Sequence, residues 1–508
     1  MNTPLIRVKN GWLDGKLLAN GVGVFRGIPF AAPPVGNLRW RPPIAPNEWR
    51  GVRKAVAFGP EAVQEADPIR VSPRGDAMIV RSEDCLYLNV WTPAQTPHAA
   101  LPVFVWIHGG SFTSGAGSHF LYDGAALAEK GVVVVTVNYR LGIFGFLAHS
   151  ELSAESESNS SGNYGLLDQI QAVRWVGENI AAFGGAPGKI TVGGQSAGAL
   201  SVSALVASPL ARGLFRRATM QSGPPFGFSG YYSQRHDAES EGARFMKAAG
   251  VKNLAALRAI AAWDLFELSR AFQYKSRITI DGRVLSDNPG NILRAGKHNR
   301  ADLLLGTTSH EFSAAYSPEK GLSGIEYRAK ARSLFGSAAD KMMQRYPAGD
   351  PAMTASAAIR MEADQLCAAA RLAAKLTSNN GNRAYLYYFT RVPPGVNART
   401  RDFYGAAHAA ELPYLFRLIN KGAVFPWDDR PWGAEDYRYS EILMSYWVNF
   451  MKNGDPNGPN LTQWPQYGGA DQRILEFGTT IAASQVPRAT KLAALESLFG
   501  MPGVKKRK

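Results

Sequence analysis

A serine in a setting suited to nucleophilic catalysis lies in the stretch Gly194-Gln-Ser-Ala-Gly198. The residues before it (190–193) suit a short buried strand and the small residues after it (199–206) suit a helix, so Ser196 stands at the tip of a sharp turn. Glycines two positions before and after the serine leave room for a strained backbone. The pattern alone is weak evidence, because roughly half a match is expected by chance in a chain with 52 glycines among 508 residues.

A serine hydroxyl is a poor nucleophile at neutral pH and requires a base that is itself oriented by an acid. In α/β-hydrolases the acid and then the histidine follow the serine, each on a loop after a strand of the sheet. The histidines that follow the serine are His236, His298, His310 and His408. Only His408 comes after both a candidate acid and a further predicted strand, 385–389, so it is the predicted base, with a structural histidine as the alternative.

The predicted acid is Glu311, on the loop after a buried strand. A glutamate beside a histidine, here His310, is often only a surface pair, so the prediction rests on the agreement of all three residues with one topology. Asp302 is the rival acid, but it begins that strand rather than following it. The predicted catalytic set therefore joins Glu311 to Ser196 and His408.

Cleavage of an acyl bond also needs donors for the negative charge that develops on the attacked carbonyl oxygen. The amide after the nucleophile, Ala197, is one predicted donor. A glycine turn, Gly109-Gly110-Ser111, ends the buried strand that begins at Leu101, and it frees further amides to point into a cavity. An ordinary tight turn is the alternative, which the pairing with the serine turn disfavours.

The order of predicted elements indicates a large mixed, mostly parallel sheet flanked by helices. Residues 132–139 suit a buried strand, and 163–183 carry apolar residues at three- and four-residue steps, as an amphipathic helix does. Strand, helix and strand in this order imply parallel strands with helical crossovers. Residues 24–39 are predicted to be an ordered loop, because their prolines remove backbone donors.

No repeat or low-complexity linker divides the chain, so a single domain over 1–508 is predicted. Residues 223–300 are rich in aromatic residues and lack strand periodicity, which favours a helical cap or substrate-pocket insertion. Five aromatic residues are predicted to line the pocket, with packing in the core as an equally good interpretation. They are Phe112, Phe226, Phe228, Phe312 and Tyr316.

Composition excludes several other classes of protein. The chain is 45% hydrophobic and 19% charged, and its longest apolar run, 131–137, falls short of the ~20 residues of a membrane helix, so no membrane partner is expected. The N-terminus lacks the apolar core of a secretion signal, which predicts a cytoplasmic protein, or a periplasmic or secreted one if a leader was removed. Cys85 and Cys367 make no disulfide framework and no metal-ligand spacing is present, so neither a metal nor a cofactor is expected.

The formal net charge of +15 raises nucleic-acid binding as a hypothesis. No basic helix, zinc module or ribonucleoprotein motif accompanies the charge, so no nucleic-acid partner is expected. Basic residues gather only in the tail, 503–508, which is predicted to be a flexible, solvated end. Binding of a polyanion by this tail is the alternative.

Longer motifs are spread over nearly the whole chain. They include Phe25-Arg-Gly-Ile-Pro-Phe-Ala-Ala-Pro-Pro-Val-Gly36, Glu83-Asp-Cys-Leu-Tyr-Leu-Asn-Val90, Asn138-Tyr-Arg-Leu-Gly142, Gly162-Asn-Tyr-Gly-Leu-Leu-Asp-Gln169 and His408-Ala-Ala-Glu-Leu-Pro-Tyr414. With these motifs and the two glycine turns, the chain resembles the type-B carboxylesterases, the family of bacterial nitrobenzyl esterases, liver carboxylesterases and cholinesterases.

This resemblance implies an α/β-hydrolase fold with helical cap insertions and a Ser-Glu-His triad. Carried onto this sequence, the triad falls on Ser196, Glu311 and His408. The oxyanion donors fall on Gly110, Ser111 and Ala197. Residues expected to support these groups are Gly109, Gln195 and Ser222, the last of which matches a serine that supports the triad acid in the family.

The chain departs from the family pattern near the predicted site. Ala62 stands where relatives often have a cysteine that pairs with the one matching Cys85, which fits a reducing compartment and a bacterial-style member. Gln195 stands where animal members commonly have a glutamate, so one buried charge is absent. The family usually has Asp-Glu-Gly around the acid, and this chain has His310-Glu311-Phe312 instead. The bulky Phe312 can alter the loop.

The predicted function is hydrolysis of small to medium organic carboxylic esters through an acyl-enzyme on Ser196. Amide, carbamate, thioester and polycarboxylate-ester substrates stay open, because the loops that build the leaving-group pocket cannot be located from sequence. A non-catalytic binding protein of the same fold is the remaining alternative, which an intact triad disfavours. The expected partner is a small-molecule ester, and the protein is expected to be a monomer or a dimer.

Overall fold

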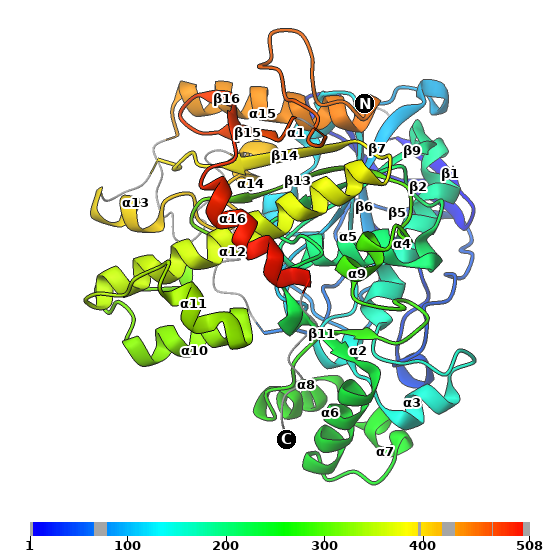
Figure 1. Ribbon diagram of the computed structural model, residues 1–508. Helices are drawn as coiled ribbons and strands as arrows, with labels where there is room; N and C mark the ends of the chain where they lie inside the picture. The colour runs from blue at the N-terminus through cyan, green and yellow to red at the C-terminus, as the bar shows by residue number, and fades with distance from the viewer. Residues whose placement is uncertain (1–3, 66–78, 395–397, 419–431, 470, 501–508) are drawn as a thin grey trace.

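A large mixed sheet forms the centre of the molecule. The computed structural model describes residues 4–65, 79–394, 398–418, 432–469 and 471–500 (Figure 1), so the basic tail at 503–508 lies outside the described residues. In spatial order the sheet's 11 strands are β16 (Ile481–Gln485), β15 (Arg473–Phe477), β14 (Ala384–Phe389), β13 (Asp302–Thr308), β10 (Arg217–Gln221), β9 (Gly185–Gln195), β7 (Leu101–Ile107), β8 (Val133–Val137), β6 (Tyr87–Thr92), β4 (Gly23–Pro29) and β3 (Lys16–Leu17).

The middle of this sheet is parallel and its two edges are antiparallel. Strands β8, β7, β9, β10, β13, β14 and β15 pair parallel with their neighbours. Pairing is antiparallel between β15 and β16, between β8 and β6, between β6 and β4, and between β4 and β3. The predicted mostly parallel sheet with helical crossovers is therefore confirmed. The carboxyl ends of its parallel strands all lie at the same edge of the sheet.

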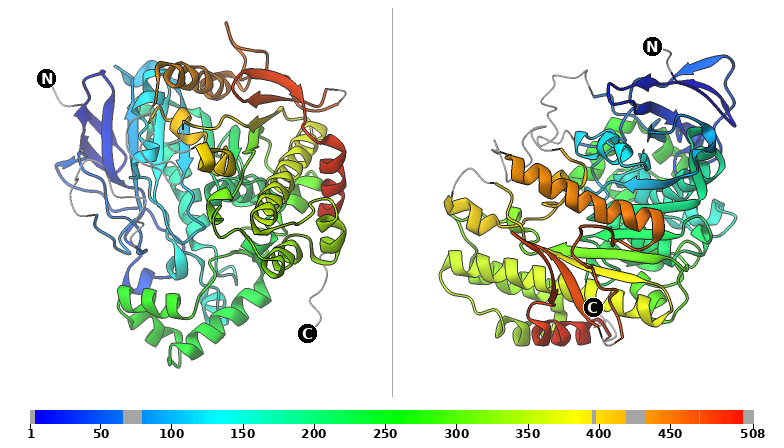
Figure 2. Two further views of the ribbon diagram at one scale, coloured as in Figure 1. Left: turned by 90° about the vertical axis from the view of Figure 1, so that its left-hand side faces the viewer. Right: turned by 90° about the horizontal axis from the view of Figure 1, so that it is seen from above.

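Helices cover both faces of the sheet, each over its own hydrophobic core (Figure 2). Alternate residues of β7 divide between the cores, with Val103 and Val105 in one and Phe104 and Trp106 in the other. The first core is covered by α4 (Tyr164–Asn179), α5 (Ala197–Ala207), α9 (Pro289–Arg294), α12 (Pro351–Asn379) and α16 (Ala489–Glu496). The second is covered by α1 (Ala125–Glu129), α14 (Leu412–Leu415) and α15 (Ala434–Asn453).

Most of the segment predicted to be a helical insertion, 223–300, lies at one end of the molecule, away from the large sheet, and only its last helix, α9, covers that sheet (Figure 1). Its helices α6 (Arg235–Ala248), α7 (Leu254–Ala259) and α8 (Ala262–Ala271) share a hydrophobic cluster with α2 (Gly142–Phe146) and α3 (Ser150–Glu155). The segment also supplies β11 (Tyr232–Gln234) and β12 (Ile278–Ile280), a two-stranded parallel sheet that the sequence analysis did not predict. Strands of three residues carry too little alternation to be recognised by periodicity.

The remaining elements lie around this frame. The helices are α10 (Gly324–Phe335), α11 (Ala339–Met343) and α13 (Ala398–Tyr404), of which α10 and α11 pack with α12. The strands are β1 (Leu5–Val8), β2 (Gly11–Asp14) and β5 (Val52–Lys54), which form a separate three-stranded sheet.

The prediction of a loop over residues 24–39 is wrong for its first part, which forms β4. Two features reconcile a strand with the glycine and proline in this stretch. Pro29 is the last residue of the strand, where a missing donor costs little. Gly27 adopts φ +66° at a register shift between Phe25 and Ile28, where an added Cβ would lie 2.6 Å from the carbonyl oxygen of Ala57.

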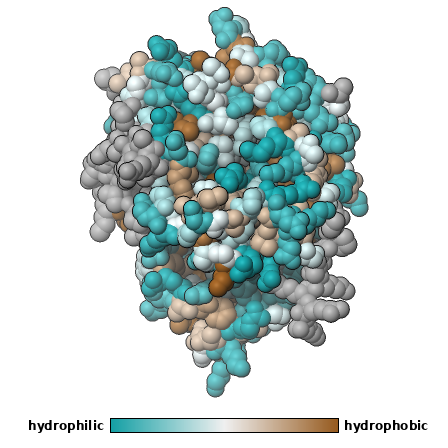
Figure 3. Space-filling model, turned by 60° about the vertical axis from the view of Figure 1, so that its left-hand side comes forward, coloured by the Kyte–Doolittle hydropathy of each residue, from teal (hydrophilic) through white to brown (hydrophobic). Residues whose placement is uncertain are grey.

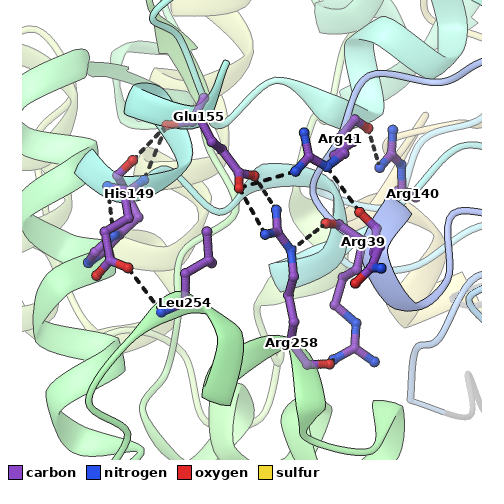
Figure 4. A network of polar contacts seen from close by, with 10 residues as sticks. Arg39, Arg41, Arg140, His149, Glu155, Leu254 and Arg258 are labelled. Carbon is purple, nitrogen blue, oxygen red and sulfur yellow. Dashed lines mark hydrogen bonds and ion pairs between the residues drawn. The ribbon is translucent and has the colours of Figure 1, made fainter.

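A network of arginines fastens the inserted helices to the body of the molecule (Figure 4). The guanidinium of Arg39, which is 5% exposed, binds both carboxylate oxygens of Glu83 at 2.7 and 2.5 Å. The same group donates to the carbonyl oxygens of Arg258 and Ile260, at 3.0 and 2.7 Å, at the end of α7. Arg258 in turn binds Glu155 at the end of α3. Paired charges with little exposure to water, such as Arg39 and Glu83, favour one arrangement of the segments that they join.

Exposed hydrophobic residues are dispersed among hydrophilic ones on the face of the molecule shown in Figure 3. The large hydrophobic side chains that are exposed include those of Leu5, Trp263 and Ile325. Within the described residues no helix combines the length and the apolar character needed to span a bilayer.

We predict that Arg39→Met lowers the free energy of unfolding by about 3 kcal/mol, because it leaves the Glu83 carboxylate, whose side chain is only 10% exposed, without its partner. Urea unfolding followed by circular dichroism measures the change. The matched control is Lys9→Met, which removes an exposed pair with Glu178 whose side chains are 61% and 53% exposed, and it should cost less than about 0.5 kcal/mol. Equal losses in the two variants would contradict the anchoring role of Arg39.

Candidate active site

Ser196 occupies a strained turn between β9 and α5. Its backbone has φ 58° and ψ −128°, a conformation that non-glycine residues rarely adopt. The flanking glycines are required by close packing: a Cβ on Gly194 would lie 2.5 Å from the backbone of Gly198. A Cβ on Gly198 would lie 2.1 Å from the carbonyl oxygen of Ile107, the last residue of β7. The turn is thus wedged against the end of the neighbouring strand.

Ser222 follows β10 in the same way that Ser196 follows β9. The register pairs Gln195 with Gln221, and the Ser196 amide donates to the Gln221 carbonyl oxygen at 2.9 Å. Ser222 also has a positive φ, 54°, and its amide donates to the carbonyl oxygen of Gly306. Its hydroxyl is buried and has no hydrogen-bond partner among the described residues, so the expected contact with the acid is not made.

The two predicted partners of the serine meet at the carboxyl ends of β13 and β14. Glu311 is 0% exposed, and one of its carboxylate oxygens accepts a hydrogen bond of 2.9 Å from the amide of Thr308. Its other oxygen is hydrogen-bonded to Nδ1 of His408. The rival acid, Asp302, lies at the opposite end of β13, where its carboxylate binds Arg383 at 2.7 Å. Asp302 therefore has no part in this pair.

Backbone contacts hold the loops of Glu311 and His408 together. The amide of His310 donates to the carbonyl oxygen of Ala406 at 3.0 Å, and His310 forms a parallel β-bridge with Ala407. The hydroxyl of Ser313 donates to the carbonyl oxygen of Tyr404 at 2.8 Å. These contacts join the loop of Glu311 to the residues just before His408, and so they hold the acid next to the imidazole.

The second nitrogen of the imidazole is occupied by a residue next to the serine. Nε2 of His408 lies 3.0 Å from the side-chain nitrogen of Gln195. An amide N–H donates, so Nε2 accepts and the proton of the neutral ring is on Nδ1, facing Glu311. No hydrogen bond joins the Ser196 hydroxyl to His408 among the described residues. Such bonds are often long without substrate and tighten in the reacting complex.

Charge near the imidazole comes from two buried carboxyl groups. Burial lowers the pKa of His408, but the charge and hydrogen bond of Glu311, with a smaller effect of Glu411, outweigh it and raise that pKa above its ordinary value. Burial raises the pKa of Glu411 itself to about 7, although Gln221 donates to it at 2.9 Å. Glu411 belongs to a motif used above only for resemblance, and sequence reasoning assigned it no role.

The second glycine turn lies directly against the serine. An added Cβ on Gly109 would be 2.7 Å from the carbonyl oxygen of Gln195 and 3.1 Å from the Cβ of Ser196. Gly110 and Ser111 have φ of 109° and 54°, which turns the chain sharply. The amides of Gly110, Ser111 and Ala197 donate to no other group in the described part of the chain, so these three predicted oxyanion donors are free.

Two residues that sequence reasoning missed support this turn. The side-chain oxygen of Gln64 accepts from the amide of Gly115 at 2.8 Å, and its nitrogen donates to the Gly115 carbonyl oxygen at 3.0 Å. The hydroxyl of Tyr231 lies 3.3 Å from that of Ser111. Neither residue carries a local signal, because each comes from a distant part of the chain.

The aromatic residues predicted to line the pocket have different surroundings. Phe112 is 0% exposed and packs on Phe146 at 4.9 Å, and Phe226 packs on Phe499 at 6.0 Å, so both belong to the hydrophobic core on the α4 and α5 side of the sheet. Each of the other three aromatic residues contacts a different group. Phe228 packs on Tyr231, the hydroxyl of Tyr316 donates to Glu362, and Phe312 stacks on His408.

A cleft of about 750 Å³ adjoins the second glycine turn on the side of α8. Its wall includes Thr113 and Ser114, whose amides both donate to the carbonyl oxygen of Gly110 at 2.9 and 3.0 Å. Apolar and polar side chains from α8 and the residues after it, among them Phe266, Arg270 and Gln273, complete the lining. Such a volume is typical of sites for small organic molecules.

The described residues include no candidate metal-ligand cluster and no disulfide. In the described ranges, no three His, Cys, Asp or Glu side chains are grouped so that they could hold a metal ion. Cys85 and Cys367 are both buried and unpaired with each other.

Comparison with known proteins identifies the family. The carboxylesterase family profile matches residues 2–495. The chain is 35% identical to the fumonisin B1 esterase of Sphingopyxis macrogoltabida, covering 94% of this chain and 87% of the relative. It is also 35% identical to the para-nitrobenzyl esterase of Bacillus subtilis, covering 93% and 94%.

Solved structures agree with this result. A PNB esterase structure, 32% identical, superposes with a TM-score of 0.83 and covers 97% of this chain and 100% of its own. The carboxylesterase EST55 of Geobacillus stearothermophilus, 33% identical, superposes with a TM-score of 0.83 and covers 97% and 99%. The chain therefore belongs to the carboxylesterase family, has the α/β-hydrolase fold and is a carboxylic ester hydrolase.

Proposed function

We propose that this chain hydrolyses small to medium organic esters through an acyl-enzyme on Ser196, with His408 as the base and Glu311 as the acid that orients it. The observation that carries the proposal is the hydrogen bond between Glu311 and Nδ1 of His408 at the sheet edge where the strained serine turn also lies. Acid, base and nucleophile on loops at the carboxyl ends of strands of one sheet are the arrangement that acyl transfer through serine requires.

The route of the proton follows from the tautomer of His408. With its proton on Nδ1, His408 offers the Nε2 lone pair, and Gln195 must release it before it can accept the proton of the Ser196 hydroxyl. The serine oxygen then attacks the ester carbonyl carbon. Glu311 stabilises the imidazolium, which next donates its Nε2 proton to the departing alcohol. The same nitrogen deprotonates the water that cleaves the acyl-enzyme and returns the proton to Ser196.

The negative charge that forms on the carbonyl oxygen needs donors already in place. We assign this role to the amides of Gly110, Ser111 and Ala197, which are free and adjoin the serine. Fixed donors cost no reorganisation when the charge develops, and each is typically worth about 3 kcal/mol of transition-state stabilisation. The scheme needs no metal or cofactor.

The substrate class rests on the cleft and on the named relatives. The relatives act, by their names, on para-nitrobenzyl esters, on fumonisin B1 and on fatty acyl-CoA. The cleft of about 750 Å³ beside Thr113 and Ser114 gives room for an organic group of moderate size.

We also propose one domain over residues 1–508, with 223–300 as a cap, and the cytoplasm as the compartment. Support for a reducing compartment comes from Cys85 and Cys367, which are both free and buried. Cys85 has no cysteine at position 62 with which to pair.

We predict that Ser196→Ala lowers kcat with nitrophenyl butyrate by about 10⁵-fold and Glu311→Gln by about 10⁴-fold. The first removes the nucleophile and the second the charge that stabilises the imidazolium. Active sites are counted by stoichiometric reaction with an organophosphate. The control, Asp302→Asn, should keep its turnover per folded molecule within about threefold, because Asp302 lies at the opposite end of β13 from the site. Full activity in Glu311→Gln together with loss in Asp302→Asn would reverse the assignment of the acid.

The pH dependence follows from the direction of the His408 shift. Only the neutral imidazole is a base, so kcat/KM rises with pH through the pKa of His408, which Glu311 holds above the ordinary 6.5. The midpoint should therefore lie above pH 6.5 in the unmodified chain. Gln195→Glu adds a carboxylate next to Nε2, favours the imidazolium and should move the midpoint further up.

The matched neutral control, Gln195→Met, should move this midpoint much less than Gln195→Glu does. Glu311→Gln should move it down. Midpoints that coincide in all these variants would rule out His408 as the titrating base.

We predict that Gly109→Ala lowers kcat by about 100-fold, because its methyl group would push the oxyanion turn away from Ser196. The matched control is Gly188→Ala on β9, where an added Cβ meets nothing within 4 Å. Steady-state kinetics and thermal denaturation of both variants separate the rate effect from stability. If Gly109→Ala keeps its kcat, the turn does not supply the oxyanion donors.

A further inference from the structure

Phe312 has a backbone conformation that favours glycine. It follows the acid Glu311 and adopts φ 58° and ψ 10°, in the left-handed region. A side chain with a Cβ is strained there, and such strain persists only where surrounding contacts hold it. A bulky aromatic side chain at this position is therefore an observation that requires a reason.

The ring of Phe312 lies on the face of the catalytic imidazole. The two ring centroids are 4.9 Å apart and the planes are inclined by 26°, which is a stacked arrangement. The two nitrogens at the edge of the same imidazole are bound by Glu311 and Gln195. Phe312 thus supplies the contact to a face of His408 that the polar groups at its edge cannot supply.

The loop that carries Phe312 cannot easily move away from His408. The residue before the acid, His310, is bonded through its amide to Ala406, and the residue after Phe312, Ser313, is bonded through its hydroxyl to Tyr404. The amide of Ser313 also donates to the carbonyl oxygen of His310 at 3.1 Å, which closes the turn around Glu311 and Phe312. The left-handed conformation is what directs a ring in this turn onto the imidazole.

An aromatic face also interacts differently with the two charge states of the imidazole. The face is electron-rich, so it attracts the imidazolium that forms in each proton transfer more than the neutral ring. The ionisable groups that act on His408 are Glu311 and Glu411, both buried carboxyls, and His310 precedes the acid in the same loop. Phe312 adds a favourable contact for the cation without adding a further charge.

We propose that Phe312 is a positioning residue for the reaction: its ring holds the imidazole of His408 in the plane that faces Ser196 and favours the imidazolium over the neutral base. The proposal rests on the proposed function, because it assigns Phe312 a role through His408. It also assigns a role to Phe312, which stands where the family usually has a glycine.

The experiment compares Phe312→Leu, Phe312→Gly and Phe312→Tyr with the surface control Trp263→Leu, whose aromatic residue is 47% exposed. Phe312→Leu keeps an apolar side chain without a π face, Phe312→Gly removes both the ring and the strain, and Phe312→Tyr restores a stacking ring. Pre-steady-state acylation and deacylation with nitrophenyl butyrate are measured against pH. Proton NMR of histidine-labelled protein follows the resonances of His408.

In Phe312→Leu we expect kcat to fall about tenfold with KM nearly unchanged, because the imidazole is less well oriented. The midpoint of the pH profile should move down by about half a unit, since a contact to the cation is lost. Phe312→Tyr should restore both quantities. Phe312→Gly should lose activity as Phe312→Leu does, while its thermal stability does not fall in proportion, because the strain is relieved.

The NMR measurement tests the stacking without relying on activity. A ring stacked on the imidazole shifts the carbon-bound protons of His408 upfield, and this shift should vanish in Phe312→Leu, including in a Ser196→Ala background. If the variants lose activity while the pH midpoint and the resonances stay unchanged, Phe312 only shapes the pocket and the proposal is overturned. Unchanged activity, midpoint and resonances overturn it as well.

Failure of the proposed function has a different signature. It would be an unmodified chain that neither turns over esters nor reacts with an organophosphate. The upfield shift of the His408 resonances would remain in that case.

Discussion

The geometry of the site depends on close packing between backbones at the carboxyl end of β7. The serine turn can sit there only because Gly194 and Gly198 have no Cβ, and Gly109 approaches Ser196 from the other side for the same reason. Contacts of 2.1 to 2.7 Å to an added Cβ leave no room for any side chain. The turn of the nucleophile and the turn of the oxyanion donors are therefore packed as one unit, and a change in either displaces the other.

A second constraint is electrostatic. Two buried carboxyl groups, Glu311 and Glu411, lie near one imidazole, and like charges in a region of low dielectric cannot all remain ionised at little cost. Glu311 faces Nδ1 of His408 and supplies the orienting charge, whereas burial raises the pKa of Glu411 to about 7. A neutral amide at Gln195 adds no third charge and leaves Nε2 as the acceptor. Phe312 completes the surroundings of the ring with an apolar contact.

Much of the scaffold could be predicted from local patterns. The strands at 101–107, 133–137 and 384–389 are continuous apolar runs, and α4 has clear helical periodicity. Strand β4 was missed because Pro29 and Gly27 look like loop residues until the pairing partner β6 is known. The short strands β11 and β12 were missed for a related reason, since their three residues acquire a pattern only when paired.

By itself the sequence determined the serine turn, the glycine turn and the order in which acid and base follow, because each depends on residues close together in the chain. The tertiary structure decided the contacts across long separations. They show that Glu311, and not Asp302, binds His408, and that Gln195 approaches Nε2 of the same ring. They also include the stacking of Phe312 on His408 and the burial of Phe112 and Phe226 in the core. Residue spacing limits where a loop begins, but the direction of a side chain depends on backbone angles and packing partners that come from distant segments.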